Sequence, residues 1–171
     1  MTVAVPPPTV SNAAAGGAAP GVELVIHFMK AIKEVLSTMA GVEVTTGKPG
    51  LKQDPVSTYD VSGIIGFSGN FGGSMVLSFK KETAVALVKG FSGMEMTPDS
   101  PDFTDAVGEL ANMIAGAAKT QFGGGTSISV PSVILGQGHV IGRLHDVPCI
   151  VIPCESAAGA FAVEVSIKSK Q

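Results

Sequence analysis

The stretch Ser100–Phe122, SPDFTDAVGELANMIAGAAKTQF, has the clearest helical period in the chain. At about 100° per residue its apolar side chains share one side of a helix, and these are Phe103, Val107, Leu110, Ile114 and Ala117. Another side carries a polar stripe with small neighbours: Asp105, Glu109 and Asn112, beside Gly108, Ala115 and Gly116. The pattern predicts a helix whose polar stripe a partner can approach closely, although a solvated face with glycines used for packing would give the same pattern.

Periodic segments on both sides of this helix follow the same order. Before it, the pattern predicts a helix, a strand, a hairpin and a linking helix, which are Val22–Met39, Val42–Thr46, Tyr59–Ser68 with Ser74–Phe79, and Lys81–Phe91. After it come a strand interrupted by Pro131 and a second hairpin: Ser127–Leu135, then Cys149–Glu155 with Phe161–Lys168. Gly41 and Gly93 are expected to end the first two helices. Helix, strand and hairpin therefore occur twice, which predicts an α+β fold of two related halves with antiparallel pairing.

Composition narrows the class of protein. We predict a single domain over residues 22–171, preceded by a flexible Pro/Ala/Gly-rich tail over residues 1–21 that has neither the basic nor the apolar part of a secretory signal. The net charge of −3 without a basic cluster argues against nucleic-acid binding, and no apolar run approaches the roughly 20 residues that span a bilayer. Cys149 and Cys154 form no Cys-x-x-Cys pair, which favours reduced thiols in the cytoplasm.

Three other patterns could suggest chemistry, and each has a simpler explanation. The glycine run in Phe122–Thr126 follows the end of a helix, where the dipole disfavours anions, so a flexible connection is expected. Gly136-Gln-Gly138 is not followed by a helix, so it is no dinucleotide fingerprint. One set of possible ligands lacks the spacing of a compact zinc site: His139, His145, Asp146 and Cys149. We therefore expect this chain to hold neither a metal nor a cofactor of its own.

The polar stripe and the proline that follows it resemble the signature of the CheC/CheX/FliY family of chemotaxis phosphatases, in the form Asp105-x-x-x-Glu109-x-x-Asn112 with Pro131. Further stretches are similar to the CheX members in particular, and these are Met39–Glu43, Ile134–His139 and Pro148–Pro153. The resemblance covers residues 22–168. It implies two α-β-β-β halves that share one antiparallel sheet with long helices packed on it, and it implies a homodimer.

The resemblance also implies an activity, the removal of phosphate from the aspartyl phosphate of a CheY-like response-regulator receiver. It implies that Asn112 orients the attacking water and that Glu109 contacts a lysine of the receiver, which itself holds Mg²⁺. Asp105 would give electrostatic support, and small residues would let the helix lie against the receiver's cleft: Gly108, Ala115 and Gly116. Some members carry Glu-x-x-Asn on two helices. The first helix here has only Glu34 and Ser37 at that spacing, so we predict one site per chain.

Physical chemistry supports these residue types independently. An acyl phosphate is already activated, so its hydrolysis mainly needs a water held in line with the departing carboxylate. An asparagine amide suits this task because its carbonyl accepts from water while its NH₂ group donates elsewhere. A carboxylate one turn away can pair with a partner lysine. Two alternatives stay open: a module that binds a receiver or a motor component without hydrolysis, and a structural dimerisation domain.

Overall fold

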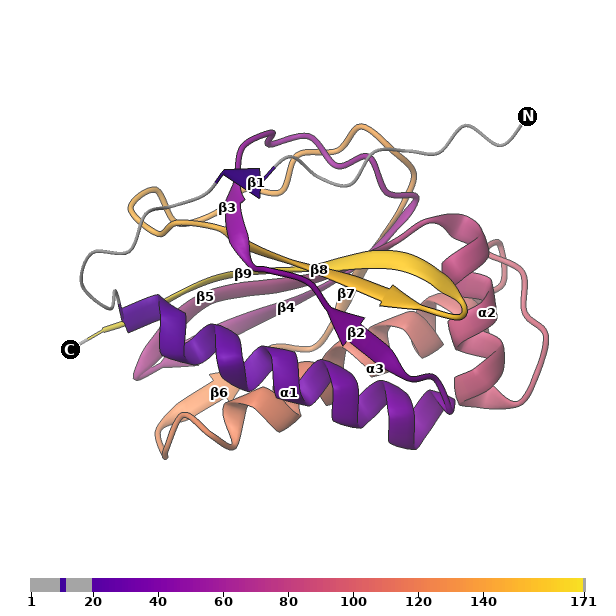
Figure 1. Ribbon diagram of the computed structural model, residues 1–171, viewed down its shortest axis with the longest axis horizontal. Helices are drawn as coiled ribbons and strands as arrows, with labels where there is room; N and C mark the ends of the chain where they lie inside the picture. Colours follow the sequence, from indigo (N-terminus) through magenta and orange to yellow (C-terminus); the bar gives the residue numbers. More distant parts are fainter. Residues whose placement is uncertain (1–9, 12–19, 171) are drawn as a thin grey trace.

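The computed structural model describes residues 10–11 and 20–170, in which nine strands form one sheet with three helices packed against it (Figure 1). The helices are α1 (Pro20–Ala40), α2 (Lys81–Ser92) and α3 (Pro101–Lys119). The strands are β1 (Val10–Ser11), β2 (Val44–Thr46), β3 (Gly50–Lys52), β4 (Val61–Gly69), β5 (Phe71–Phe79), β6 (Thr126–Ile128), β7 (Ser132–Leu135), β8 (Ile150–Ser156) and β9 (Gly159–Ser169). All their pairings are antiparallel, which confirms the predicted α+β class.

The two halves exchange their first strands across the sheet. Strands β5 and β9 pair in the middle, flanked by their hairpin partners β4 and β8. The broken strand β6/β7 of the second half pairs with β4 of the first, and the broken strand β2/β3 of the first half pairs with β8 of the second. This arrangement confirms the prediction of two repeated halves that share one sheet. It also shows that the first strand of each half pairs with a strand of the other half, which the sequence did not predict.

The strand register defines a pseudo-twofold axis. The residue pair Gly50–Val151, which joins β3 to β8, corresponds to the pair Ser132–Ile64, which joins β7 to β4. Gly50 and Ser132 are 82 positions apart in the sequence, and Ile64 and Val151 are 87 positions apart. The same two offsets relate the pair of β2 with β8 to the pair of β6 with β4. In the middle of the sheet, Val76 of β5 pairs with Glu164 of β9, and the same symmetry relates these two residues to each other. The axis therefore passes between β5 and β9 at that pair.

Helices α1 and α3 lie side by side on one face of the sheet, and α2 covers one end of the molecule (Figure 1). Their apolar faces and the facing strand residues form one core, with fully buried side chains that include Phe28, Leu36, Ile65, Leu77, Phe103 and Leu110. Each such side chain contributes about 1.5–3 kcal/mol when it leaves water. The predicted stops are confirmed, since Gly41 and Gly93 follow their helices with φ of 64° and 73°, which glycine adopts without strain.

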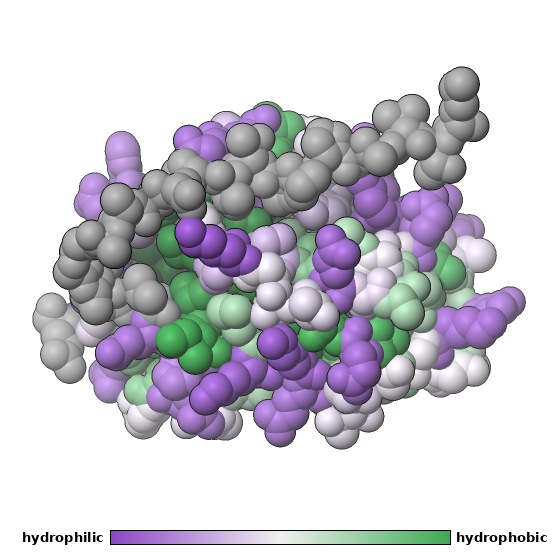
Figure 2. Space-filling model, in the orientation of Figure 1, coloured by the Kyte–Doolittle hydropathy of each residue, from purple (hydrophilic) through white to green (hydrophobic). Residues whose placement is uncertain are grey.

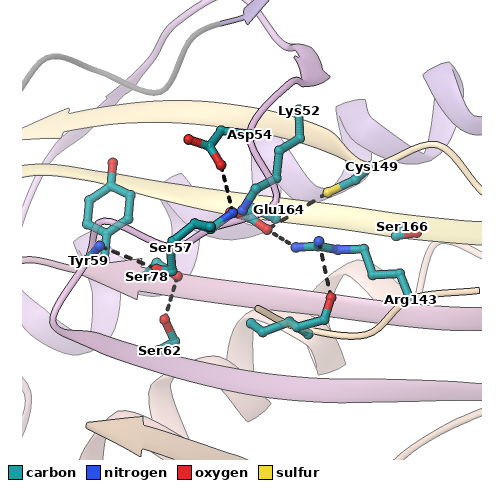
Figure 3. Close-up of polar contacts among 12 residues, drawn as sticks. Lys52, Asp54, Ser57, Tyr59, Ser62, Ser78, Arg143, Cys149, Glu164 and Ser166 are labelled. Atoms are coloured by element: carbon teal, nitrogen blue, oxygen red, sulfur yellow. Dashed lines mark hydrogen bonds and ion pairs between the residues drawn. The ribbon is translucent and has the colours of Figure 1, made fainter. Parts of the chain in front are cut away.

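The opposite face of the sheet is polar at its centre. Residues alternate along β9, so Val163 and Val165 join the helix-side core while Glu164 points the other way. Two connecting segments cover this face, residues 53–60 and 136–149, and an isolated bridge between Val56 and Val140 links them. Glu164 lies beneath them, 6% exposed, and forms ion pairs with Lys52 at 2.5 Å and with Arg143 (Figure 3).

The structure corrects several predicted boundaries. Helix α1 begins at Pro20, inside the segment predicted as a tail, and Val10–Ser11 of that segment pairs with β3. The rest of the predicted tail lies outside the described residues. Strand β3, which begins at Gly50, was missed by the sequence pattern. The interruption predicted at Pro131 is confirmed, because it separates β6 from β7.

Candidate functional site on helix α3

Helix α3 presents the predicted polar stripe on the surface. Proline stands in its first turn, after Ser100, and Phe103, Val107 and Leu110 bury its apolar face completely. Asp105 and Glu109 are exposed and Asn112 is half-buried. The geometry required of a site that meets a partner is therefore present, since neither the amide nor the carboxylate is sealed in the core.

The stripe is unpaired within the part of the chain that the structure describes. Within residues 20–170, the side chains of Asp105, Glu109 and Asn112 form no hydrogen bond and no ion pair. On other surfaces of the molecule comparable groups are engaged, such as Glu95, which pairs with Lys89 at 2.6 Å. Two carboxylates and an amide on one helix face therefore keep their full capacity to bind a ligand or a partner.

The small residues beside the stripe have three different roles. Ala115 is fully buried, so the prediction that it contacts a partner is wrong. Gly108 is also buried, and a Cβ on it would lie 3.1 Å from Cγ of Pro131, so its lack of a side chain serves packing within the chain. Gly116 faces open space, with Cδ1 of Ile128 at 4.0 Å as the nearest atom to an added Cβ. Of the three, only Gly116 leaves open space beside the stripe, and its contact with a partner stays a prediction.

A hollow of about 460 Å³ opens beside the carboxylate end of the stripe. Its lining combines two acids with small and apolar groups: Thr104, Asp105, Gly108, Glu109, Pro131 and Val133. The sequence indicated Pro131 as an interruption in a strand and as part of the family signature, but it gave no signal for Thr104 or Val133. These two residues become part of the site because β7 packs along α3.

Helix α1 occupies the pseudo-symmetric position but lacks the stripe. The 82-residue offset of the strands also relates the two glycines of positive φ that follow the helices, Gly41 and Gly123. The same offset makes His27 and Lys30 of α1 the equivalents of Glu109 and Asn112 of α3. Glu34 and Ser37, which have the spacing of the motif, therefore do not stand at the equivalent positions, and Ser37 donates a hydrogen bond to Glu43 at 2.5 Å.

The equivalent position on α1 carries a ring that packs on the core and a cation that faces solvent. The ring of His27 is half-buried, with its centroid 6.3 Å from that of Phe122, while Lys30 is exposed. Figure 2 shows several hydrophilic side chains along α1. No carboxylate–amide pair stands at this position, so the described geometry contains the stripe on α3 alone.

The other candidate groups are occupied in local structure. Nδ1 of His139 lies 3.0 Å from the carbonyl oxygen of Gly136, and within residues 10–11 and 20–170 no three His, Cys, Asp or Glu side chains lie close enough to hold a metal ion. Burial, followed by the negative charge of Glu164, raises the pKa of the Cys149 thiol to about 11, which makes it a poor nucleophile. In the same described residues no helix is long and apolar enough to cross a membrane.

Comparison with known proteins gives a consistent result. The family model described as chemotaxis phosphatase CheX matches residues 61–155. The CheY-P phosphatase CheX of Thermotoga maritima is 31% identical over 153 residues, which cover 85% of this chain and 96% of that protein.

Solved structures agree in both sequence and fold. A putative chemotaxis protein of Desulfovibrio vulgaris Hildenborough is 40% identical with a TM-score of 0.76, over 88% of this chain and all of the other. The CheX of a CheX–CheY–BeF₃–Mg²⁺ complex from Borrelia burgdorferi is 27% identical with a TM-score of 0.70, over 85% of this chain and 98% of the other. Because the family model matches more than half of this chain and the Thermotoga maritima relative is similar to most of it, the chain belongs to the CheX family of chemotaxis phosphatases.

Proposed function

We propose that this chain hydrolyses the aspartyl phosphate of a phosphorylated CheY-like receiver domain. The observation that carries the proposal is the exposed stripe of α3, in which Glu109 and Asn112 have no partner within residues 20–170. The names of the relatives support it, since one is a CheY-P phosphatase and another was solved in complex with CheY. The proposal places the reaction in the cytoplasm, where receivers carry their phosphate.

In the proposed reaction, water attacks phosphorus and the bond between phosphorus and the aspartyl oxygen breaks. The products are inorganic phosphate and the free aspartate, so no oxidant, reductant or covalent intermediate on this chain is needed. The side-chain carbonyl of Asn112 accepts a hydrogen bond from the water and holds it in line with the departing carboxylate. The carboxylate of Glu109 pairs with a lysine of the receiver and fixes the register of the two proteins. The Mg²⁺ that balances the phosphoryl charge belongs to the receiver.

The direct test follows the loss of phosphate label from candidate phosphorylated receivers, with and without this protein. A shortened lifetime for at least one receiver is the expected result. Unchanged lifetimes for every receiver of the source organism, together with retained binding, would instead favour a docking module without hydrolytic activity.

A variant Glu109→Gln separates the contribution of charge from that of shape. Since Glu109 is exposed and forms no hydrogen bond or ion pair within residues 20–170, the variant should fold as the wild type does. Loss of the pairing with the receiver lysine should weaken receiver binding by about tenfold and slow hydrolysis at saturation. Isothermal titration and single-turnover kinetics measure the two effects. Wild-type values for both would contradict the lysine contact.

We also propose that two copies associate through the face opposite the helices. The two segments that cover this face expose apolar side chains next to one another, Val56 and Val140, which pair in the isolated bridge, and Leu144 close by in sequence. Such a patch is typical of a surface that another protein covers. Sedimentation equilibrium should give twice the chain mass of 17.2 kDa, and Val140→Asp should give the monomer. A monomeric wild type would overturn this association without affecting the site on α3.

A further inference from the structure

An exposed valine precedes Pro131, which lines the acidic hollow, and the chain around it holds it in place. Val130 is 84% exposed, and its segment between β6 and β7 belongs to neither strand. The hydroxyl of Ser129 accepts a hydrogen bond from the amide of Gly66 at 2.9 Å and donates one to the carbonyl of Val130 at 2.8 Å. The amide of Ser129 donates to the carbonyl of Gly66. These bonds tie the segment to β4, so Val130 points to solvent from an ordered position.

The next residue fixes this segment to α3 as well. Pro131 packs on the bare backbone of Gly108, and an added Cβ there would lie 3.1 and 3.2 Å from two atoms of the proline ring. The residue nearest to an added Cβ on Gly116 is Ile128 of β6, whereas Gly108 packs on Pro131 and Val133. Asn112 lies midway between these two glycines along the helix. The amide is therefore level with the segment that carries Val130.

The chemistry of the hollow behind Val130 suits one kind of side chain. Asp105 and Glu109 line it without any cation from residues 20–170 to pair with them. Pro131 and Val133 give it an apolar wall. A lysine or arginine has an aliphatic stem that packs on such a wall and a charge that the two acids would bind.

From these observations we infer a second contact with the receiver, which rests on the proposed function: an apolar side chain of the receiver packs on Val130 while a neighbouring basic side chain enters the hollow toward Asp105. The receiver is the occupant because the hollow is continuous with the Glu109–Asn112 stripe that engages it. An exposed apolar residue on a rigid segment can bury area without an ordering cost. Val130 and Asp105 thus determine which receivers dock productively, and they take no part in the chemical step.

The test compares Val130→Asp with Ile26→Asp. Ile26 is a matched control because it is also β-branched and 50% exposed, and it lies on α1 at the position equivalent to Gly108. For a receiver that the wild type dephosphorylates, Val130→Asp should raise KM by roughly tenfold or more and leave kcat within about twofold. Ile26→Asp should match the wild type in both parameters. The affinity for the same receiver loaded with beryllofluoride and Mg²⁺ should fall in parallel with the change in KM.

Each outcome decides the inference separately from the proposed function. Unchanged KM and affinity for Val130→Asp, or an equal loss for both variants, would overturn the contact. A wild type that hydrolyses no receiver but binds the beryllofluoride form would remove the phosphatase activity, and the affinities of the two variants would still test the contact. A fall in kcat for Val130→Asp with KM unchanged would overturn it too, because the residue would then act on the chemical step.

Discussion

Replacing Asn112 with alanine should slow receiver-stimulated phosphate release by about 100-fold or more while leaving receiver affinity nearly unchanged. The side chain is half-buried on the surface of α3 and bonds to nothing within residues 20–170, so its removal neither opens a cavity in the core nor orphans a buried group. What the variant loses is the carbonyl that holds the water in line with the leaving carboxylate. Single-turnover decay of the phosphorylated receiver, with enzyme in excess, measures this loss directly.

Two further variants sharpen the result. Asn112→Asp keeps the shape but sets an anion against the phosphoryl oxygens, so it should lose at least as much rate as alanine does. Asp102→Ala, an exposed substitution in the first turn of the same helix, should behave as the wild type. Decay at the wild-type rate with Asn112→Ala would remove the amide from the mechanism. A parallel fall in affinity would assign it to docking.

Local sequence patterns predicted most of the elements but not how the strands pair. Alternation and turn residues identified β4, β5, β8 and β9, because a half-buried strand must alternate and a hairpin needs its turn. The exchange of β2/β3 and β6/β7 between halves depends on contacts between residues roughly 60 to 110 positions apart. The alternation of residues within one strand does not show which distant strand pairs with it.

The same limit explains why the pattern could neither align α1 with α3 nor show that Ala115 is buried. Glu34 and His27 differ by seven residues, which is nearly two helical turns, so both positions show the same face of α1 and periodicity cannot choose between them. The strand register after the helix makes that choice. Ala115 lies only about 60° around the helix from Asn112, and that rotation is enough to bring it into the core. The sequence pattern identified the stripe, but packing determines which of the residues beside it are buried.

The buried charge cluster on the pseudo-twofold axis was also invisible in the sequence. Glu164 occupies one place in an alternating strand, whereas its two cations come from distant segments, Lys52 at the end of β3 and Arg143 in the segment before β8. All three side chains are at most 13% exposed. One carboxylate thus fastens the end of β3, where one covering segment begins, and the other covering segment to the middle of the sheet (Figure 3).

Replacing Glu164 with alanine should lower the free energy of unfolding by about 3–5 kcal/mol, because two cations would stay buried without their anion. That is a large part of the roughly 5–15 kcal/mol that a domain possesses. Urea unfolding followed by circular dichroism measures the change. Since the cluster lies on the face away from α3, the folded fraction should still dephosphorylate the receiver at the wild-type rate.

A matched ion pair and a neutralised cluster show whether burial is the cause. Lys89 and Glu95 are 2.6 Å apart, nearly the distance between Lys52 and Glu164, but they are exposed, so Glu95→Ala should leave the unfolding midpoint unchanged. Methionine at all three positions of the cluster removes every buried charge and keeps most of the volume, so this triple variant should recover most of the stability that Glu164→Ala loses. Equal stability of Glu164→Ala and Glu95→Ala would show that the cluster is solvated. A triple variant no more stable than Glu164→Ala would show that the ion pairs themselves, and not the unpaired cations, account for the loss.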